Sequence, residues 1–112
     1  MIITKWNQAQ QKKNPHNVDV RLLYDKSDAQ AMHIFLNPGE KLNPHITPVD
    51  VFFVVLEGEP SIQVGEEIKQ TEYNALIESP KNIKHCIYNE TDKPARILVV
   101  KTPKQSSASK IL

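Results

Sequence analysis

The apolar residues of this chain occur in short runs separated by turn-forming residues, and no segment shows the spacing of a long amphipathic helix. The strongest run, residues 51–56, contains only valine, phenylalanine and leucine. Because no polar residue interrupts it, it predicts a strand that is covered on both faces. Further strands are expected at residues 18–24, 31–36, 61–64, 68–71, 75–77, 86–88 and 96–101. Short strands between turns predict an all-β sandwich or barrel with almost no helix.

The length of the chain sets the number of domains. With 112 residues it can form one hydrophobic core, and little remains for a second. We expect a single barrel domain over residues 1–102. Residues 103–112 are polar and serine-rich, so they are expected to form a flexible tail.

Charge and composition exclude several classes of partner. Fourteen basic and thirteen acidic side chains give a net charge of +1, so nothing indicates a nucleic-acid partner. The longest apolar run is far too short to span a bilayer, and the N-terminus is not organised like a signal peptide. The single cysteine, Cys86, cannot form an internal disulfide, which fits a reducing compartment. We therefore expect a cytoplasmic protein with no membrane partner.

Two segments each place a histidine among turn residues at a defined spacing. In the first, intervals of five, one, three and six residues separate Gly39, His45, Thr47, Val51 and Gly58. In the second, intervals of five, one, two and three residues separate Asn74, Pro80, Asn82, His85 and Asn89.

These spacings resemble the two motifs of the cupin superfamily, usually written G-x5-H-x-H-x3,4-E-x6-G and G-x5-P-x-G-x2-H-x3-N. The two motifs cover about half of the chain. The resemblance implies a small single-domain cupin, whose fold is a double-stranded β-helix, a jelly-roll-like barrel. Asn74 and Asn82 stand where the motif has glycine, and asparagine accepts a positive φ better than most residues. Both positions are therefore expected in left-handed turns.

The resemblance assigns His45 and His85 as metal ligands, since the family holds a divalent metal with three histidines and a glutamate. The other two ligand positions are occupied by Thr47 and Val51. Valine cannot bind a metal and threonine binds it poorly, so two imidazoles remain. The expected cofactor is none, or a weakly held divalent transition metal such as Zn, Ni, Fe or Mn.

Three other residues are candidates for substitute ligands. Asp50 adjoins the missing glutamate position, but strand alternation turns it away from Val51 unless a bulge intervenes. His33 could point into the barrel or simply pack in its strand. Cys86 should face away from its neighbour His85 and act as a small buried filler. His16 follows Pro15 in a loop, where solvent exposure is expected.

Carrying the family positions over, the cavity wall consists of His45, Thr47, Val51, Phe53, His85 and Ile87. This wall suits a small, partly apolar molecule with one or two polar groups. We therefore expect a small-molecule-binding cupin that is non-catalytic or regulatory, and no residue is assigned a catalytic role. The alternative is a metal-dependent enzyme, of the isomerase or dioxygenase kind, whose metal has substitute or water ligands.

The expected protein partner is a second copy of the chain. Both faces of residues 51–56 are apolar, and residues 2–6 and 18–24 are strand-like segments that need packing partners. In many small cupins such strands pack on, or exchange with, the sheet of a second subunit. The resemblance therefore implies a homodimer.

Overall fold

The computed structural model describes residues 1–112, and nearly all of its regular structure is strand. One three-residue 3-10 turn, η1 (Trp6–Gln8), precedes the strands. The ten strands are β1 (Asp19–Lys26), β2 (Ala29–Leu36), β3 (His45–Ile46), β4 (Asp50–Glu57), β5 (Ser61–Val64), β6 (Glu67–Gln70), β7 (Leu76–Ser79), β8 (Lys84–Tyr88), β9 (Ala95–Thr102) and β10 (Lys110–Ile111). The predicted all-β chain with almost no helix is confirmed. No helix is long and apolar enough to cross a membrane.

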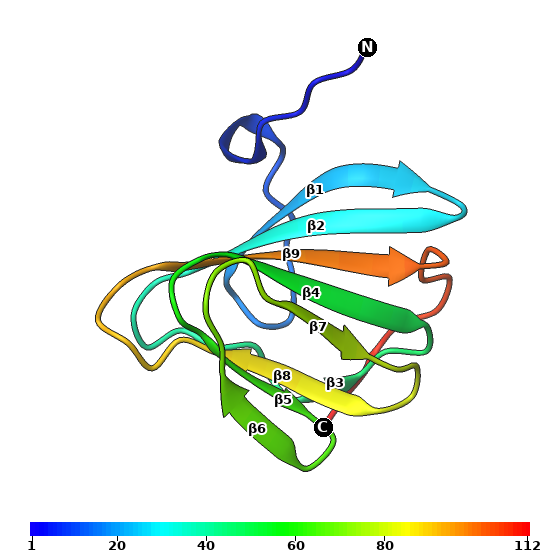
Figure 1. Cartoon of the computed structure of the whole chain (residues 1–112). Helices are drawn as coiled ribbons and strands as arrows, with labels where there is room; N and C mark the ends of the chain where they lie inside the picture. The colour runs from blue at the N-terminus through cyan, green and yellow to red at the C-terminus, as the bar shows by residue number, and fades with distance from the viewer.

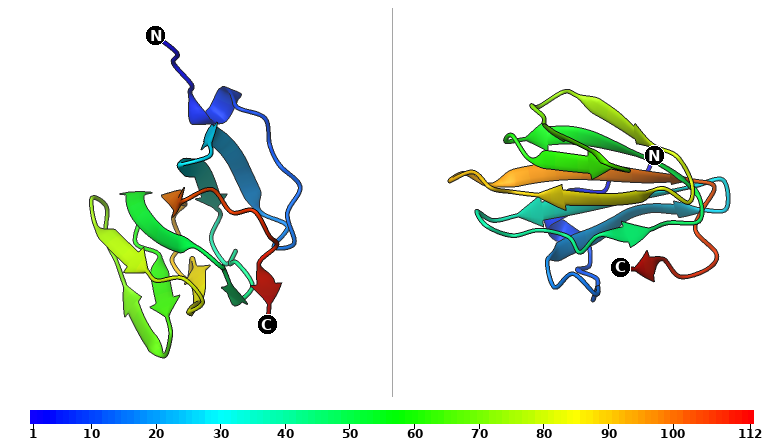
Figure 2. Two further views of the ribbon diagram at one scale, coloured as in Figure 1. Left: turned by 90° about the vertical axis from the view of Figure 1, so that its right-hand side faces the viewer. Right: turned by 90° about the horizontal axis from the view of Figure 1, so that it is seen from below.

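The strands form two antiparallel sheets of five strands each, in the orders β1-β2-β9-β4-β7 and β10-β3-β8-β5-β6 (Figure 1). The two sheets lie as facing layers of one barrel (Figure 2). From β2 onwards the chain crosses repeatedly between them, for example from β4 to β5 and from β7 to β8. This is the jelly-roll-like double-stranded β-helix that the sequence predicts.

The core lies between the two sheets, and β4 shows how the sequence places it there. Alternate side chains of a strand point to opposite faces, so Val51, Phe53 and Val55 are buried inside the barrel. On the outer face Phe52 is half-buried and Leu56 is 37% exposed. The prediction that both faces are covered therefore holds within one chain only for the inner face.

The two ends of the chain differ from their predicted structures. Residues 2–5 form no strand, and Ile2 and Ile3 are exposed. The expectation of a strand at residues 2–6 is therefore wrong. The tail, expected to be flexible throughout, ends in β10, which pairs with β3. The edge of β3 provides the backbone partners for this pairing, and the Leu112 N–H also donates to the Pro44 carbonyl at 2.9 Å.

The turns that frame the two motif segments have the backbone conformations expected of them. Asn74 and Asn82 have φ values of 72° and 65°, which confirms their left-handed assignment. The Asn82 N–H donates to the Thr47 carbonyl at 2.9 Å, so this turn is tied to the end of β3. The turn residues thus bring the two motif segments together at one place in the barrel.

Gly58 is the turn position most sensitive to substitution. A Cβ there would lie 2.5 Å from the Pro94 carbonyl oxygen, and φ is +81°. At Gly39, where φ is +84°, a Cβ would meet nothing within 4 Å. We expect Gly39→Ala to lower the free energy of unfolding by about 1 kcal/mol through backbone strain alone. Gly58→Ala should cost about 2–3 kcal/mol more because the backbone must move apart. Urea unfolding of both variants checks this, and equal losses would contradict it.

Candidate functional site

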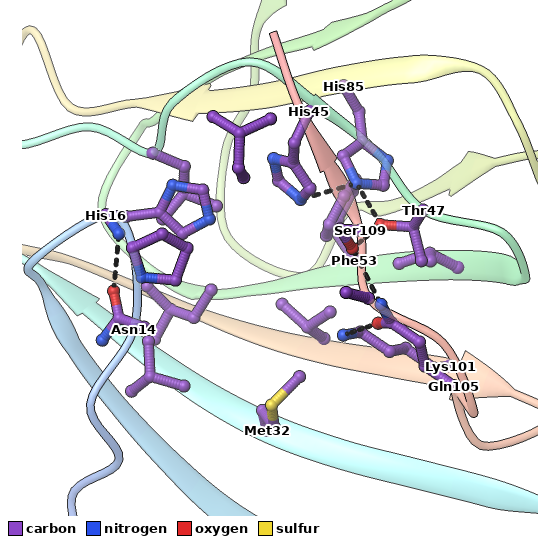
Figure 3. Close-up of a pocket in the computed structure, with 18 residues that line it drawn as sticks. Asn14, His16, Met32, His45, Thr47, Phe53, His85, Lys101, Gln105 and Ser109 are labelled. Carbon is purple, nitrogen blue, oxygen red and sulfur yellow. Dashed lines mark hydrogen bonds between the residues drawn. The ribbon is translucent and has the colours of Figure 1, made fainter.

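A cavity of about 320 Å³ opens between the two sheets beside the C-terminal tail (Figure 3). Both sheets, the 14–16 loop and the tail contribute to it. Its apolar wall is formed by Pro15, Val20, Met32, Ile34, Leu42, Val51, Phe53, Val99, Ala108 and Ile111. Its polar groups come from Asn14, His16, His45, Thr47, His85, Lys101, Gln105 and Ser109. The lining contains no aspartate or glutamate.

His45 and His85 lie side by side inside this cavity, as their motif spacing predicts. They are directly opposite each other in the pairing of β3 with β8, and both are buried. Their Nε2 atoms are 3.1 Å apart, and the rings meet edge to face. Two residues forty positions apart are thus joined by one hydrogen bond.

The partners of the two rings determine which nitrogens carry protons. The Asn43 carbonyl lies 2.8 Å from His45 Nδ1, so that nitrogen must donate and His45 Nε2 must accept. His85 Nε2 therefore donates to His45 Nε2. His85 Nδ1 is then the acceptor for the Ser79 hydroxyl at 2.7 Å. The two neutral imidazoles form a continuous chain of hydrogen bonds that runs from a hydroxyl to a backbone carbonyl.

Burial keeps both imidazoles neutral. It is the main cause that lowers the pKa of His85 to about 3, and the nearby His45 and the Lys101 cation lower it further. Burial also lowers the pKa of His45, against the hydrogen bond to Asn43, which raises it. At neutral pH neither ring carries a charge, so the pair can accept or donate hydrogen bonds but provides no cation.

The side chains present do not fit a resident metal ion. The two facing imidazoles offer two nitrogens, and Thr47 Oγ1, which lies 3.2 Å from His85 Nε2, belongs to a hydroxyl that binds metals poorly. Val51 occupies the remaining ligand position, and no group of three His, Cys, Asp or Glu side chains is close enough to hold a metal. Protein sites that keep a catalytic metal supply three ligands or more.

None of the substitute ligands reaches the cavity. Asp50 is exposed, and its carboxylate accepts a hydrogen bond from the Lys81 N–H at 2.9 Å. His33 lies on the outer face of β2, where it stacks on Trp6 with ring centroids 4.2 Å apart. Cys86 is buried with its Sγ 3.0 Å from the Leu42 carbonyl, which fits a structural role. Strand alternation turns all three away from the site.

The sequence predicts four cavity residues besides the two histidines. Three of them line the cavity, namely Thr47, Val51 and Phe53. Ile87 does not, so its assignment to the cavity wall is wrong. It is fully buried in the core, opposite Ile62 of β5. Ile87 shares a strand face with His85 but lies about 7 Å farther along β8.

Among the cavity residues that the sequence analysis does not assign, His16 and Lys101 carry titratable groups. His16, expected in solvent, is half-buried with its ring 4.8 Å from that of His45. Its Nδ1 accepts the Asn43 N–H at 2.8 Å, and burial, with help from the cationic forms of His45 and Lys101, lowers its pKa to about 4. Lys101 falls in a predicted strand without an assigned role. Its inward position follows from alternation, since Val99 of the same strand is a core residue.

Comparison with solved structures supports the fold. The protein TT1209 from Thermus thermophilus is 26% identical over 92% of this chain and 98% of that chain, with a TM-score of 0.79. The polyketide cyclase RemF from Streptomyces resistomycificus is 16% identical over 100% of this chain and 85% of that chain, with a TM-score of 0.85. The DMSP lyase DddQ from Ruegeria pomeroyi is 14% identical over 97% of this chain but 59% of that chain, with a TM-score of 0.77.

At these identities the two enzymes show likeness of fold alone. No curated protein matches the sequence. The family described as Cupin domain matches residues 32–101, which include both motif segments and the strands that carry them. Since this match spans more than half of the 112 residues, the chain belongs to the cupin domain family.

Proposed function

We propose that this protein binds a small, partly apolar molecule in the barrel cavity and does so without a resident metal. The observation that carries the proposal is the cavity itself, in which an apolar wall faces a cluster of hydrogen-bonding groups. Its volume of about 320 Å³ falls near the lower end of the range for ligand pockets. Proteins of this fold include a polyketide cyclase and a DMSP lyase, so binding of a small molecule suits the barrel.

The chemistry of the site favours binding or regulation over catalysis. A general base works best when its pKa lies near the working pH. The pKa values of His85, about 3, and His16, about 4, make both rings weak bases at neutral pH. No carboxylate lines the cavity to act in their place.

A fragment library screened by ligand-observed NMR tests the proposal. Met32 is half-buried and lines the cavity, so Met32→Trp should fill part of it and weaken fragment binding at least about tenfold. Met32→Leu keeps the volume and is the matched control. Fragments that bind parent and both variants equally would show that binding occurs elsewhere, and the proposal would fail.

We also propose that the protein is a homodimer that pairs the outer face of the sheet β1-β2-β9-β4-β7. Strand register places Phe52, Val54, Leu76, Leu98 and Val100 on this face. Leu76 is 57% exposed and the other four are half-buried, so one chain leaves much of this apolar surface uncovered. A two-fold partner would cover it with the same surface of a second copy.

This dimer predicts a different response to charge at two sites. Leu98→Asp should place a carboxylate in the contact and shift the protein to a mass near the 12.8 kDa of one chain. Ile68→Asp is the control, since Ile68 is 57% exposed and lies on β6 of the other sheet. Light scattering of both variants and the parent measures the effect. A monomeric parent would refute the dimer.

A further inference from the structure

Lys101 is the one charged side chain that lines the cavity. It follows Val99 on the inward face of β9 and pairs in register with Val51 of β4, so the strands fix its direction into the barrel. Lysine is almost never fully buried unless it is paired, and Lys101 is half-buried. Here burial lowers the pKa of the Lys101 ammonium, which shows that its charge is held at a cost.

No carboxylate of the chain accompanies this ammonium. None of the five salt bridges of the structure includes Lys101. By contrast, Lys104, three residues later, pairs with Asp25 at 2.8 Å. The one hydrogen bond of Lys101 Nζ goes to the Gln105 amide oxygen at 2.6 Å. An ammonium has three donors, so two remain for another acceptor.

The surroundings of Lys101 provide neutral donors and an apolar surface. The Gln105 amide nitrogen donates to Ser109 Oγ at 2.9 Å, and that hydroxyl is 3.2 Å from Thr47 Oγ1 (Figure 3). On the other side, Val99 and Met32 lie next to each other in the sheet and form part of the apolar wall. A ligand with one polar and one apolar end could therefore contact the polar groups and the apolar wall of the same cavity at once.

We propose that the ligand is a small organic acid whose carboxylate binds the Lys101 ammonium while its apolar body rests on the wall that includes Met32 and Val99. This inference rests on the proposed function and names the chemical class of its ligand. A carboxylate would take the free donors of the ammonium and offset its loss of hydration. The neutral imidazoles of His16, His45 and His85, the other titratable groups of the cavity, place no charge against this arrangement.

Matched probes separate charge recognition from simple apolar binding. Phenylacetate, 3-phenylpropanoate and 4-phenylbutanoate are compared with their amides and with amines of the same skeletons, by calorimetry at low ionic strength. We expect at least one acid to bind about tenfold or more tightly than its amide, and the amine to bind most weakly.

Three variants test whether Lys101 causes the preference for the acid. Lys101→Met should weaken binding of the acid about tenfold and leave the amide unchanged, since methionine keeps the length and apolar stem of the side chain. Lys104→Met, in the exposed tail, should change neither. Lys101→Arg should keep the preference for the acid, which shows that the cation rather than the fold is responsible.

The two modes of failure are distinguishable. Amides that bind as tightly as acids, or a preference that survives Lys101→Met, would overturn the assignment of the anion to Lys101 and leave the proposed cavity function intact. A protein that binds none of the probes, and none of the library fragments, would overturn both.

Discussion

The double substitution Thr47→His plus Val51→Glu is expected to raise the affinity for Zn²⁺ or Ni²⁺ by about two orders of magnitude or more. The two new side chains would join His45 and His85 to give four ligands. Thr47 Oγ1 already lies 3.2 Å from His85 Nε2, and Val51 lines the same cavity. Chelation by four preorganised groups should far exceed that by two imidazoles that now hydrogen-bond to each other.

Competition with a chromophoric chelator, on protein purified without a histidine tag, measures this gain. The matched control is Thr47→Asn plus Val51→Gln, which adds polar side chains of similar size without a third imidazole or a carboxylate. We expect this control to bind metal no better than the parent. If the parent binds metal as tightly as the Thr47→His, Val51→Glu variant, the present residues already form a competent site, and the metal-free account is wrong.

Acidification from about pH 7.5 to pH 5 is expected to destabilise the fold by several kcal/mol. Burial lowers the pKa values of His16 and His33 to about 4 and that of His85 to about 3, from 6.5. Between these values the unfolded chain binds protons that the folded chain does not. The contribution of these neutral rings to the free energy of unfolding is therefore present above about pH 6.5. It is lost as the pH falls towards the pKa values of the folded state. At pH 5 each fully buried ring should contribute a loss of about 2 kcal/mol, and half-buried His16 less.

Urea unfolding across this pH range, with His33→Gln as a test variant, checks the sign and the source. His33 is suitable because it lies outside the cavity and its Nδ1 is buried without a partner. Removing its titration should reduce the loss between pH 7.5 and pH 5 by about 2 kcal/mol. Stability that is flat or rises on acidification would contradict the neutral, buried state of these rings.

Much of the fold was predictable because local signals agree with it. Strand alternation within residues 51–56 buries Val51 and Phe53, and asparagine at positions 74 and 82 takes the left-handed conformation that the turns need. The approach of His45 to His85 was predicted by the two motif spacings, and the structure places the two histidines opposite each other in the pairing of β3 with β8.

Other parts of the site depend on contacts between residues far apart in the sequence, which local sequence patterns do not predict. His16 reaches the cavity because the Asn43 N–H holds its loop, across 27 positions of sequence. Ser109 reaches the cavity because the end of the polar tail pairs with the backbone edge of β3. The composition of the tail does not favour such a strand pairing. Lys101 is different, since its place two residues after the core residue Val99 was a usable signal.

The most direct test of a metal-independent ligand cavity is calorimetric titration of the tightest-binding fragment before and after exhaustive treatment with a chelator. We expect the same dissociation constant in both titrations, with one fragment bound per chain. Loss of binding on chelation, restored by one equivalent of a divalent transition metal, would contradict the account and favour the metal-dependent enzyme.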